Sequence, residues 1–245
     1  MLGAHKGKGI DLLTFDVCTT YAERHWESHA KRCVETFNEF WPGFHLITFQ
    51  DAELEDASDW LAEFKDRHKD RPTENYRFDA VRFAHKVAAI ELAFYGGGSD
   101  SLIWMDADCV THATVDRRWL SNLAGSSDFA YLSRTRKYTE SGFMIFRRND
   151  RTAELIKRWC DLYRSDNLFQ LKEWHDCYAL DHAREAMGGT LRSVSLSGGA
   201  ANTSHPLVNG PLGARLDHCK GGRKVAGHSP HSDLKVRRIE AYWNG

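Results

Sequence analysis

The sequence lacks a hydrophobic run close to the roughly 18 residues that a membrane-spanning helix needs. The apolar stretch at residues 10–15 is too short for the core of a secretion signal. The six cysteines include no Cys-x-x-Cys pair, which argues against a zinc ribbon and a dense disulfide scaffold. We therefore expect a cytoplasmic protein with reduced thiols and no transmembrane segment.

Three common motifs are also missing. No Gly-x-Gly-x-x-Gly follows the first predicted strand, no P-loop lysine motif is present, and no Gly-x-Ser-x-Gly elbow occurs. These absences disfavour dinucleotide binding, P-loop phosphoryl transfer and α/β-hydrolase chemistry.

The net charge of −1 excludes a globally basic nucleic-acid binder, but the charge is unevenly distributed. Residues 51–79 contain ten acids and five bases, whereas residues 184–245 contain nine bases and four acids. The basic C-terminal region suits a phosphate-bearing ligand or a polyanionic acceptor, and its alternative is a solvated face.

Length and periodicity favour one α/β domain of 245 residues. In the first half, predicted strands alternate with predicted helices, which indicates a parallel, doubly wound sheet. The strands are expected at residues 10–15, 44–49 and 101–105, and the helices at 21–40, 51–70 and 77–95. The second half is more mixed, with strands expected at 129–133, 142–146 and 191–196, helices at 150–163 and 175–187, and loops after 198. The predicted fold is thus an α/β sandwich with a mostly parallel central sheet and a mixed C-terminal half.

Two aspartates end the most apolar of these runs, Ser101-Leu-Ile-Trp-Met-Asp106-Ala-Asp108. Alternate residues of an extended chain point the same way, so Asp106 and Asp108 can face one point just past the strand. In an open α/β sheet that point is the usual ligand crevice. Two oxygen donors there suit Mg²⁺ or Mn²⁺ bound with a phosphorylated ligand, and the alternative is an acidic turn.

A second cluster lies late in the chain, at Asp217-His218-Cys-Lys220-Gly221-Gly222-Arg223-Lys224. Glycines let the backbone approach an anion closely, and lysines neutralise phosphate charge. His218 can complete a metal site begun by the aspartates, because imidazole is a ligand for Mn²⁺. The alternative for this cluster is a basic surface turn.

Three further clusters carry chemically useful groups. Arg82 and Lys86 are spaced i, i+4 on one predicted helix face, from which they can reach a phosphate or a sugar hydroxyl. Glu140 precedes a predicted strand and can contact a donor or acceptor hydroxyl. Asp176, in Glu173-Trp-His-Asp176, begins a predicted helix and can touch a sugar or stabilise positive charge. A solvated basic face and helix capping are the alternatives for the first and last clusters.

The order of these motifs resembles that of GT-A-type glycosyltransferases, which use nucleotide sugars, over about residues 10–228. The Asp-x-Asp combined with a late His-x-x-Gly-x-x-Lys is similar to the pattern of retaining, glycogenin-like and galactosyltransferase-like enzymes. The resemblance implies a GT-A, Rossmann-like sandwich in which residues 10–110 form the nucleotide-binding half. Residues 111–245 would form the acceptor-binding half, including a C-terminal loop that binds metal and diphosphate.

The resemblance also implies roles for individual residues. The two aspartates and the histidine would bind Mn²⁺ or Mg²⁺, and the acid near the donor sugar would match Asp176, with Glu140 as a second catalytic candidate. The implied metal ligands are Asp106, Asp108 and His218. The implied binding residues for the UDP-sugar are Thr14, Tyr21, Arg82, Lys86, Asp106 (through the ribose), Gly221 and Lys224 (through the leaving diphosphate).

The chain departs from the family pattern at two positions. Glu140-Ser-Gly stands where glycogenin-like enzymes usually have Asn-Ser-Gly, and Asp176-Cys177 stands where many have Asp-Gln. These differences leave the sugar and the stereochemical outcome open. With retention, the leaving phosphate would accept the proton of the acceptor, whereas inversion requires a carboxylate base, Asp176 or Glu140.

The expected reaction is transfer of a hexose from UDP-glucose or UDP-galactose to a hydroxyl group. A cell-surface glycan precursor is one acceptor consistent with a cytoplasmic bacterial enzyme. Modified DNA is another, as in viral enzymes that glucosylate hydroxymethylated pyrimidines in the infected cell. Two other classes of protein remain open: a nucleotidyltransferase, which would be expected to have glycines soon after the first strand, and a non-catalytic sugar- or nucleic-acid-binding module.

Overall fold

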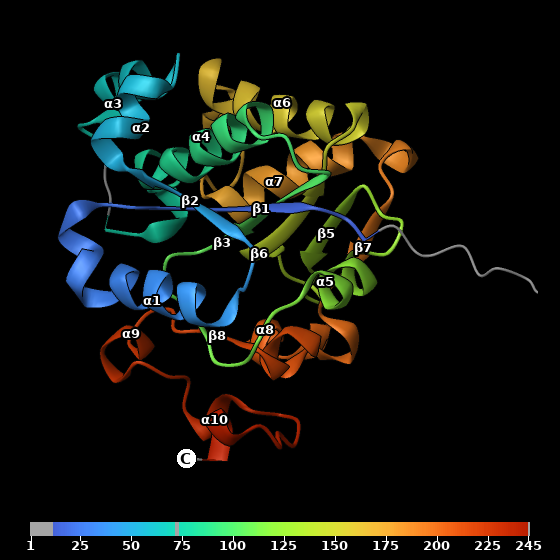
Figure 1. The fold of residues 1–245 in the computed structure, drawn as a ribbon. Helices are drawn as coiled ribbons and strands as arrows, with labels where there is room; N and C mark the ends of the chain where they lie inside the picture. Colours follow the sequence, from blue (N-terminus) through green and yellow to red (C-terminus); the bar gives the residue numbers. More distant parts are fainter. Residues whose placement is uncertain (1–11, 72–73, 245) are drawn as a thin grey trace, which may run out of the picture.

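A six-stranded sheet forms the centre of the molecule (Figure 1), in a computed structural model that describes residues 12–71 and 74–244. The strand order is β2-β1-β3-β6-β5-β7. The bounds are β1 Phe15–Tyr21, β2 His45–Gln50, β3 Ser101–Met105, β5 Phe129–Leu132, β6 Glu140–Arg147 and β7 Ser193–Ser195. β1 pairs in parallel with β2 and β3, and β5 with β7, whereas β6 is antiparallel to β3 and β5. The predicted fold class, a mostly parallel α/β sandwich with a mixed second half, is confirmed.

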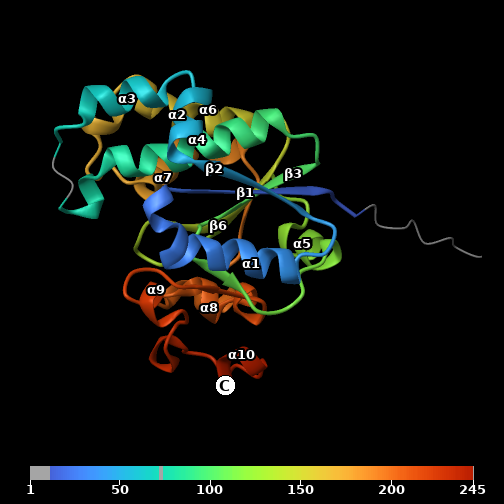
Figure 2. The same cartoon turned by 60° about the vertical axis from the view of Figure 1, so that its left-hand side comes forward.

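Helices cover both faces of this sheet (Figure 2). One face carries α2 (Asp51–Ala57), α3 (Leu61–His68), α4 (Ala80–Gly96), α6 (Asp150–Arg164) and α7 (Asp176–Ala186). The other carries α1 (Lys31–Phe40), α5 (Arg117–Ala124) and α8 (Pro206–Asn209). None of the helices in the described ranges is both long and apolar enough to cross a bilayer.

Strand β3 shows why the sheet has two cores. All five of its residues are buried, as expected for a central strand covered on both faces. Leu102 and Trp104 pack in the core under α4, whereas Ile103 and Met105 pack in the core under α1. The strand therefore holds the chain that follows it, which includes Asp106, in a fixed position.

The last part of the described chain, residues 198–244, lies beneath α1 and is called the C-terminal arm below (Figure 1, orange to red). It contains α8, the strand β8 (Leu216–His218) and the short helices α9 (Arg223–Ala226) and α10 (Ala241–Asn244). Strand β8 pairs antiparallel with β4 (Cys109–Thr111), which immediately follows the two aspartates. This two-stranded sheet connects the arm to the central sheet.

Some predicted boundaries are wrong. β1 begins at Phe15, where the predicted strand ends, and Ile10 lies outside the described residues. The error arose because β1 contains the polar Thr19, which is fully buried, so its sequence does not look like an apolar run. The expected helix at 51–70 is divided into α2 and α3, and the one at 21–40 becomes regular only in α1.

The sheet topology brings distant parts of the sequence to one edge. Since β1 and β3 are parallel, both end at this edge, and β6, being antiparallel, begins there. The backbone N–H of Asp106 donates to the carbonyl of Gly142 at 2.9 Å, which joins the end of β3 to the beginning of β6. This edge is the expected position of a ligand site in an open α/β sheet.

Candidate metal and nucleotide site

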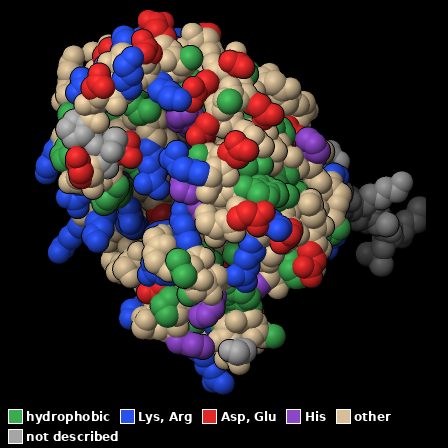
Figure 3. Space-filling model, turned by 90° about the vertical axis from the view of Figure 1, so that its left-hand side faces the viewer, with side chains coloured by type: hydrophobic (Ala, Val, Ile, Leu, Met, Phe, Trp, Pro, Cys, Tyr) green, Lys and Arg blue, Asp and Glu red, His purple; other side chains and the backbone are tan. Residues whose placement is uncertain are grey.

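A cavity of about 1190 Å³ opens at this edge of the sheet. Figure 3 shows the face concerned, with Lys and Arg side chains gathered around a hollow. Ten of the residues selected from the sequence line this cavity: Tyr21, Arg82, Lys86, Asp106, Asp108, Glu140, Asp176, His218, Gly221 and Lys224. The structure thus brings together groups from six separate parts of the chain.

Thr14 is the predicted donor-binding residue that the structure does not bring to this cavity. Its backbone N–H and its hydroxyl donate to Asp100 Oδ2 at 2.8 and 2.7 Å, next to the beginning of β1. The cavity is lined instead by Thr20 and Tyr21, at the opposite end of that strand. The shift in the position of β1 explains this error, so Thr14 is withdrawn as a donor-binding residue.

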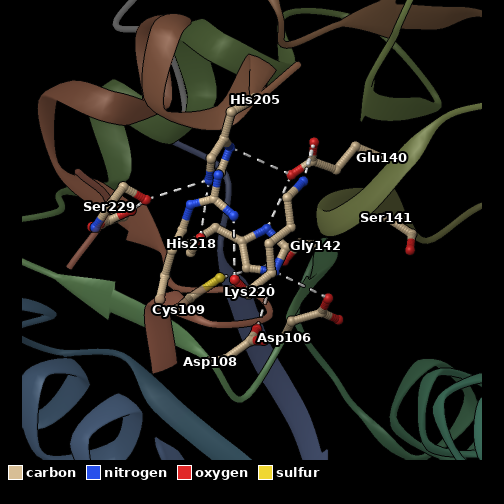
Figure 4. A network of polar contacts seen from close by, with 12 residues as sticks. Asp106, Asp108, Cys109, Glu140, Ser141, Gly142, His205, His218, Lys220 and Ser229 are labelled. Atoms are coloured by element: carbon tan, nitrogen blue, oxygen red, sulfur yellow. Dashed lines mark hydrogen bonds and ion pairs between the residues drawn. The ribbon is translucent and has the colours of Figure 1, made fainter. Parts of the chain in front are cut away.

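Asp106, Asp108 and His218 converge on one point (Figure 4). His218 Nε2 lies 3.0 Å from Asp108 Oδ1 and 3.5 Å from Asp106 Oδ2. The pairing of β4 with β8 causes this convergence, because Cys109 is in register with His218. Gly142 forms one wall against the imidazole, and a Cβ atom at that position would collide with the ring.

Each aspartate has one oxygen held by the protein and one directed toward the imidazole. Asp106 Oδ1 accepts from Lys86 Nζ at 2.8 Å and from Trp104 Nε1 at 2.7 Å. Asp108 Oδ2 lies 3.0 Å from Lys224 Nζ. Asp108 Oδ1 is buried and makes no hydrogen bond to any described residue, although it lies close to His218 Nε2. The site therefore offers two carboxylate oxygens and one imidazole nitrogen, and the oxygen from Asp108 has no hydrogen-bond partner in the described part of the chain. This set of donor atoms fits a divalent cation such as Mn²⁺ or Mg²⁺.

Glu140 lies behind His218, on the side away from the aspartates. Its Oε1 lies 3.0 Å from His218 Nδ1, and its Oε2 lies 2.9 Å from Lys220 Nζ. Burial alone raises the pKa of Glu140, but the hydrogen bond with His218 and the charge of Lys220 outweigh it and hold that pKa well below its usual range. Burial likewise opposes the charged form of His218, but Asp108 and Glu140 raise its pKa to about 9.

Lys86 is a buried cation at the centre of a second network. Its ammonium lies 2.8 Å from Asp106 Oδ1 and 2.8 Å from Asp176 Oδ2, and it also donates to the hydroxyl of Ser141 at 2.7 Å. Burial opposes its charge, yet the two carboxylates hold the pKa of Lys86 above its usual range. The pKa of Asp176 is lowered to about 2, because Lys86 and Ser141 outweigh the effect of burial. The protein therefore keeps a carboxylate charged in the cavity at neutral pH.

Lys224 joins the end of the cavity that holds Asp108 to the π-helical segment Trp26–Ala30, which precedes α1. Its ammonium lies 3.0 Å from Asp108 Oδ2 and 3.5 Å from His29 Nε2. Partial burial and the charge of Lys224 lower the pKa of His29 to about 4, so this imidazole is neutral at pH 7. Gly221, with a φ of +62°, allows the turn that precedes α9. The sequence does not identify His29 as a cavity residue, because nothing in the residues around it indicates that it will lie beside Lys224.

The basic residues of the C-terminal arm do not form the free polyanion surface that their number suggested. Arg223 donates to Asp233 at 2.5 Å, and Arg238 donates to the backbone carbonyl of Val208. Lys220 is paired with Glu140, as described above. Much of the positive charge of the arm therefore holds its own fold together.

Arginines without a carboxylate partner line the cavity instead, although Arg134 donates to the backbone carbonyl of Tyr138 and Arg71 donates to His68. Four arginines that line it have no carboxylate within 4.0 Å among residues 12–71 and 74–244: Arg24, Arg71, Arg82 and Arg134. The phenol groups of Tyr76 and Tyr138 bond to each other at 2.7 Å, and the Tyr138 ring lies 4.3 Å from that of His175. These tyrosines were not selected from the sequence, since nothing in their immediate neighbourhood marks them.

Comparison with known proteins shows the fold. A scan of protein-family models and a search of curated proteins found no match to the sequence. Among solved structures, the chain is similar to one described as a glycosyltransferase involved in the glycosylation of the major capsid of PBCV-1, with a TM-score of 0.53 and 11% sequence identity. The match covers 87% of this chain and 98% of that chain. The chain therefore shares its overall fold with that structure.

Proposed function

We propose that the protein is a metal-dependent glycosyltransferase that moves a hexose from a nucleoside-diphosphate sugar, UDP-glucose or UDP-galactose, to an acceptor hydroxyl. The observation that supports this most directly is the convergence of Asp106, Asp108 and His218, with Lys224 beside them, in a cavity of a glycosyltransferase-like fold. The donor set suits a cation that itself binds a diphosphate.

In this proposal, the first half of the chain, residues 10–110, binds the nucleotide. Tyr21, Arg82 and Asp106 line the part of the cavity assigned to it. Lys224 and the flexible turn at Gly221, in the acceptor-binding half 111–245, contact the leaving diphosphate. Asp106, Asp108 and His218 hold Mn²⁺ or Mg²⁺, which when bound stabilises the charge that grows on the diphosphate as the glycosidic bond breaks.

Asp176 is the proposed catalytic carboxylate. It is buried and charged, and the ion pair between its Oδ2 and Lys86 Nζ, at 2.8 Å, holds the carboxylate in a fixed position. A fixed negative charge stabilises the positive charge that develops at the anomeric carbon. The carboxylate of Asp176 is engaged by Lys86 at 2.8 Å and by the Ser141 hydroxyl at 2.5 Å, so it is poorly placed to accept a proton, and we infer retention with the leaving phosphate accepting it. Lys86 is the shared counter-ion of Asp176 and Asp106, and it acts by keeping both carboxylates charged and in place.

The acceptor is proposed to carry phosphate groups. The four arginines at the cavity mouth, which lack carboxylate partners, and the neighbouring Tyr76 and Tyr138 favour a polyanion with planar rings. Hydroxymethylpyrimidine DNA fits this description best, and a phosphorylated cell-surface glycan precursor is the second candidate. A nucleotidyltransferase or a non-catalytic sugar-binding module are the alternatives to the proposed reaction.

The proposed function is tested by measuring UDP release from UDP-glucose and UDP-galactose, with and without Mn²⁺. The acceptors are hydroxymethylated DNA, unmodified DNA and water, and the matched control is Asp108→Asn. Metal-dependent release that hydroxymethylated DNA stimulates supports both the reaction and the acceptor. Slow metal-dependent hydrolysis that DNA does not change supports the transferase and rejects DNA. No release from any UDP-sugar would reject the central proposal.

The acceptor assignment has its own measurement. The guanidinium of Arg134 donates to the backbone carbonyls of Tyr138 and Thr139 and has no carboxylate partner among the described residues. If its charge also contacts a phosphate, Arg134→Gln weakens DNA binding and lowers the slope of log K against log salt by about 1. The control Arg158→Gln, on the exposed surface of α6 and paired with Glu154, leaves that slope unchanged. Equal slopes for the parent protein and Arg134→Gln would reject this contact.

A further inference from the structure

Glu140 occupies a position that the catalytic roles above leave unexplained. It is the first residue of β6, it is only about 4% exposed, and it is one of the residues that line the cavity. Figure 4 shows its carboxylate beside the His218 ring. A cationic or imidazole nitrogen lies beside each of its two oxygens: His218 Nδ1 is 3.0 Å from Oε1, and Lys220 Nζ is 2.9 Å from Oε2 in an ion pair without hydrogen-bond geometry. A carboxylate engaged at both oxygens is poorly placed to accept a proton from an acceptor.

We propose that Glu140 is a positioning residue that orients His218 so that its Nε2 is directed at the divalent cation. This inference rests on the proposed metal-dependent function. A bound metal ion displaces the proton from Nε2. A histidine that then donates from Nδ1 to a carboxylate directs its Nε2 lone pair at the metal ion, and the carboxylate fixes the plane of the ring. In this chain Nε2 is the ring atom that lies between Asp106 and Asp108.

The surroundings of the ring support an orienting role for Glu140. Gly142 lies against one side of the imidazole and leaves no room for a Cβ atom there. The backbone carbonyl of His218 lies 3.0 Å from His205 Nε2, which fixes the main chain but not the side chain. Rotation of the His218 ring about its Cβ–Cγ bond is therefore restrained by Glu140 on one side and by the two aspartates on the other.

Lys220 gives the same carboxylate a second task. This ammonium is two residues from a proposed metal ligand and would repel a nearby divalent cation. Glu140 holds it at 2.9 Å on the far side of the His218 ring from the aspartates. Removal of the carboxylate is thus expected to disturb both the orientation of the imidazole and the local charge balance.

The test is the affinity of the full-length protein for Mn²⁺ alone, measured from the free-Mn²⁺ signal in electron paramagnetic resonance. Glu140→Ala is expected to weaken Mn²⁺ binding by about 10- to 100-fold. Glu140→Gln is expected to fall between this variant and the parent protein. Its single amide oxygen can accept from His218 or from Lys220, but not from both at once.

Glu91→Gln is the matched control, because Glu91 also lies between a ring N–H and a cation. It accepts from Trp60 Nε1 at 2.8 Å and lies 2.9 Å from Arg164 Nη2, among residues that do not line the cavity. Its Mn²⁺ affinity is expected to equal that of the parent protein. A general loss of stability would affect this control as well, whereas an orienting role affects the Glu140 variants only.

The outcomes separate this inference from the proposed function. Parent-like Mn²⁺ affinity in Glu140→Ala and Glu140→Gln, combined with loss of binding in Asp108→Asn, would overturn the inference and leave the metal site standing. A Glu140→Gln variant that binds Mn²⁺ normally but loses turnover would identify Glu140 as a base and also overturn it. Absence of Mn²⁺ binding in the parent protein would reject the proposed function and this inference together.

Discussion

The central sheet and the C-terminal arm contribute to the same site but are held in different ways. Asp106 follows a strand buried on both faces, so apolar packing fixes its position. The arm has only short elements, and many of its contacts are polar. Asp217, for example, accepts from the Ser229 hydroxyl at 2.6 Å and from the Tyr242 hydroxyl at 2.9 Å. Hydrogen bonds are directional and costly to leave unmade, so single substitutions should perturb the arm more selectively than the sheet.

The largest expected effect is at the proposed metal site, in the segment that directly follows strand β3. Asp108→Asn removes a charged ligand and is expected to lower kcat/KM by roughly 1,000-fold, which corresponds to about 4 kcal/mol. Steady-state UDP release measures it. The melting temperature is expected to fall as well, because the substitution leaves the imidazole of His218 and the ammonium of Lys224 without the carboxylate that pairs with them. Unchanged turnover in the folded variant would contradict the assignment of this ligand.

The contact between the two regions is tested at Gly142. In Gly142→Ala the added methyl group collides with the His218 ring and should cost about 1–3 kcal/mol of stability. The displaced ring should also bind Mn²⁺ more weakly. Thermal unfolding and Mn²⁺ titration measure the two effects. Gly98→Ala is the control, since a Cβ atom there meets no other atom within 4 Å; equal behaviour of the two variants would contradict the predicted collision.

A smaller and more local effect is expected in the arm. Asp217→Asn weakens the acceptor used by Ser229 and Tyr242, at a cost of about 1–3 kcal/mol. Amide hydrogen exchange should increase in residues 216–244 and remain unchanged in β1, β3 and β6. Uniformly faster exchange throughout the described chain would show that the arm and the sheet unfold as one unit.

The smallest expected effect is on the stability of the fold at Asp128, which directly precedes β5, and it depends on acidic pH. The pKa of Asp128 is lowered to about 2 by the hydrogen bonds and charge of Arg192, which outweigh burial. A carboxylate whose pKa is lowered by folding stabilises the folded protein at pH values above its pKa in the unfolded chain, about 3.9. This contribution is lost as the pH falls toward 2. Urea unfolding at pH 6, 4 and 2 should show the advantage of the parent protein over Asp128→Asn shrinking. A constant difference across these values would contradict this assignment.

The sequence predicts the site best where one short segment carries the whole signal. The run that ends in Asp106 and Asp108 is apolar because β3 is buried on both faces, so its position at the edge of the sheet could be inferred locally. His218 and Lys224 were found by their spacing and their resemblance to a family pattern. The structure places both in the same cavity as the aspartates.

The sequence predicts poorly what depends on partners far along the chain. Thr19 is buried because neighbouring strands cover it, and its own segment gives no sign of this burial. The strand predicted at residues 10–15 therefore lies too early in the sequence, and Thr14 falls before the true β1 instead of at the cavity. The pairing of Glu140 with His218 depends on the register of β4 against β8, so the sequence alone indicates Glu140 as a catalytic candidate without showing this contact. The cations of the arm could not be divided into structural and free groups without their contacts.

The pairing of β4 with β8 also has a consequence for how the protein is made. The two strands are about a hundred residues apart in sequence, which makes this one of the more distant contacts to form during folding. On the ribosome, the central sheet through β6 emerges before His218 and Lys224 have been synthesised. A nascent or prematurely terminated chain therefore carries both aspartates without their imidazole partner, and the site is assembled only when translation has passed β8.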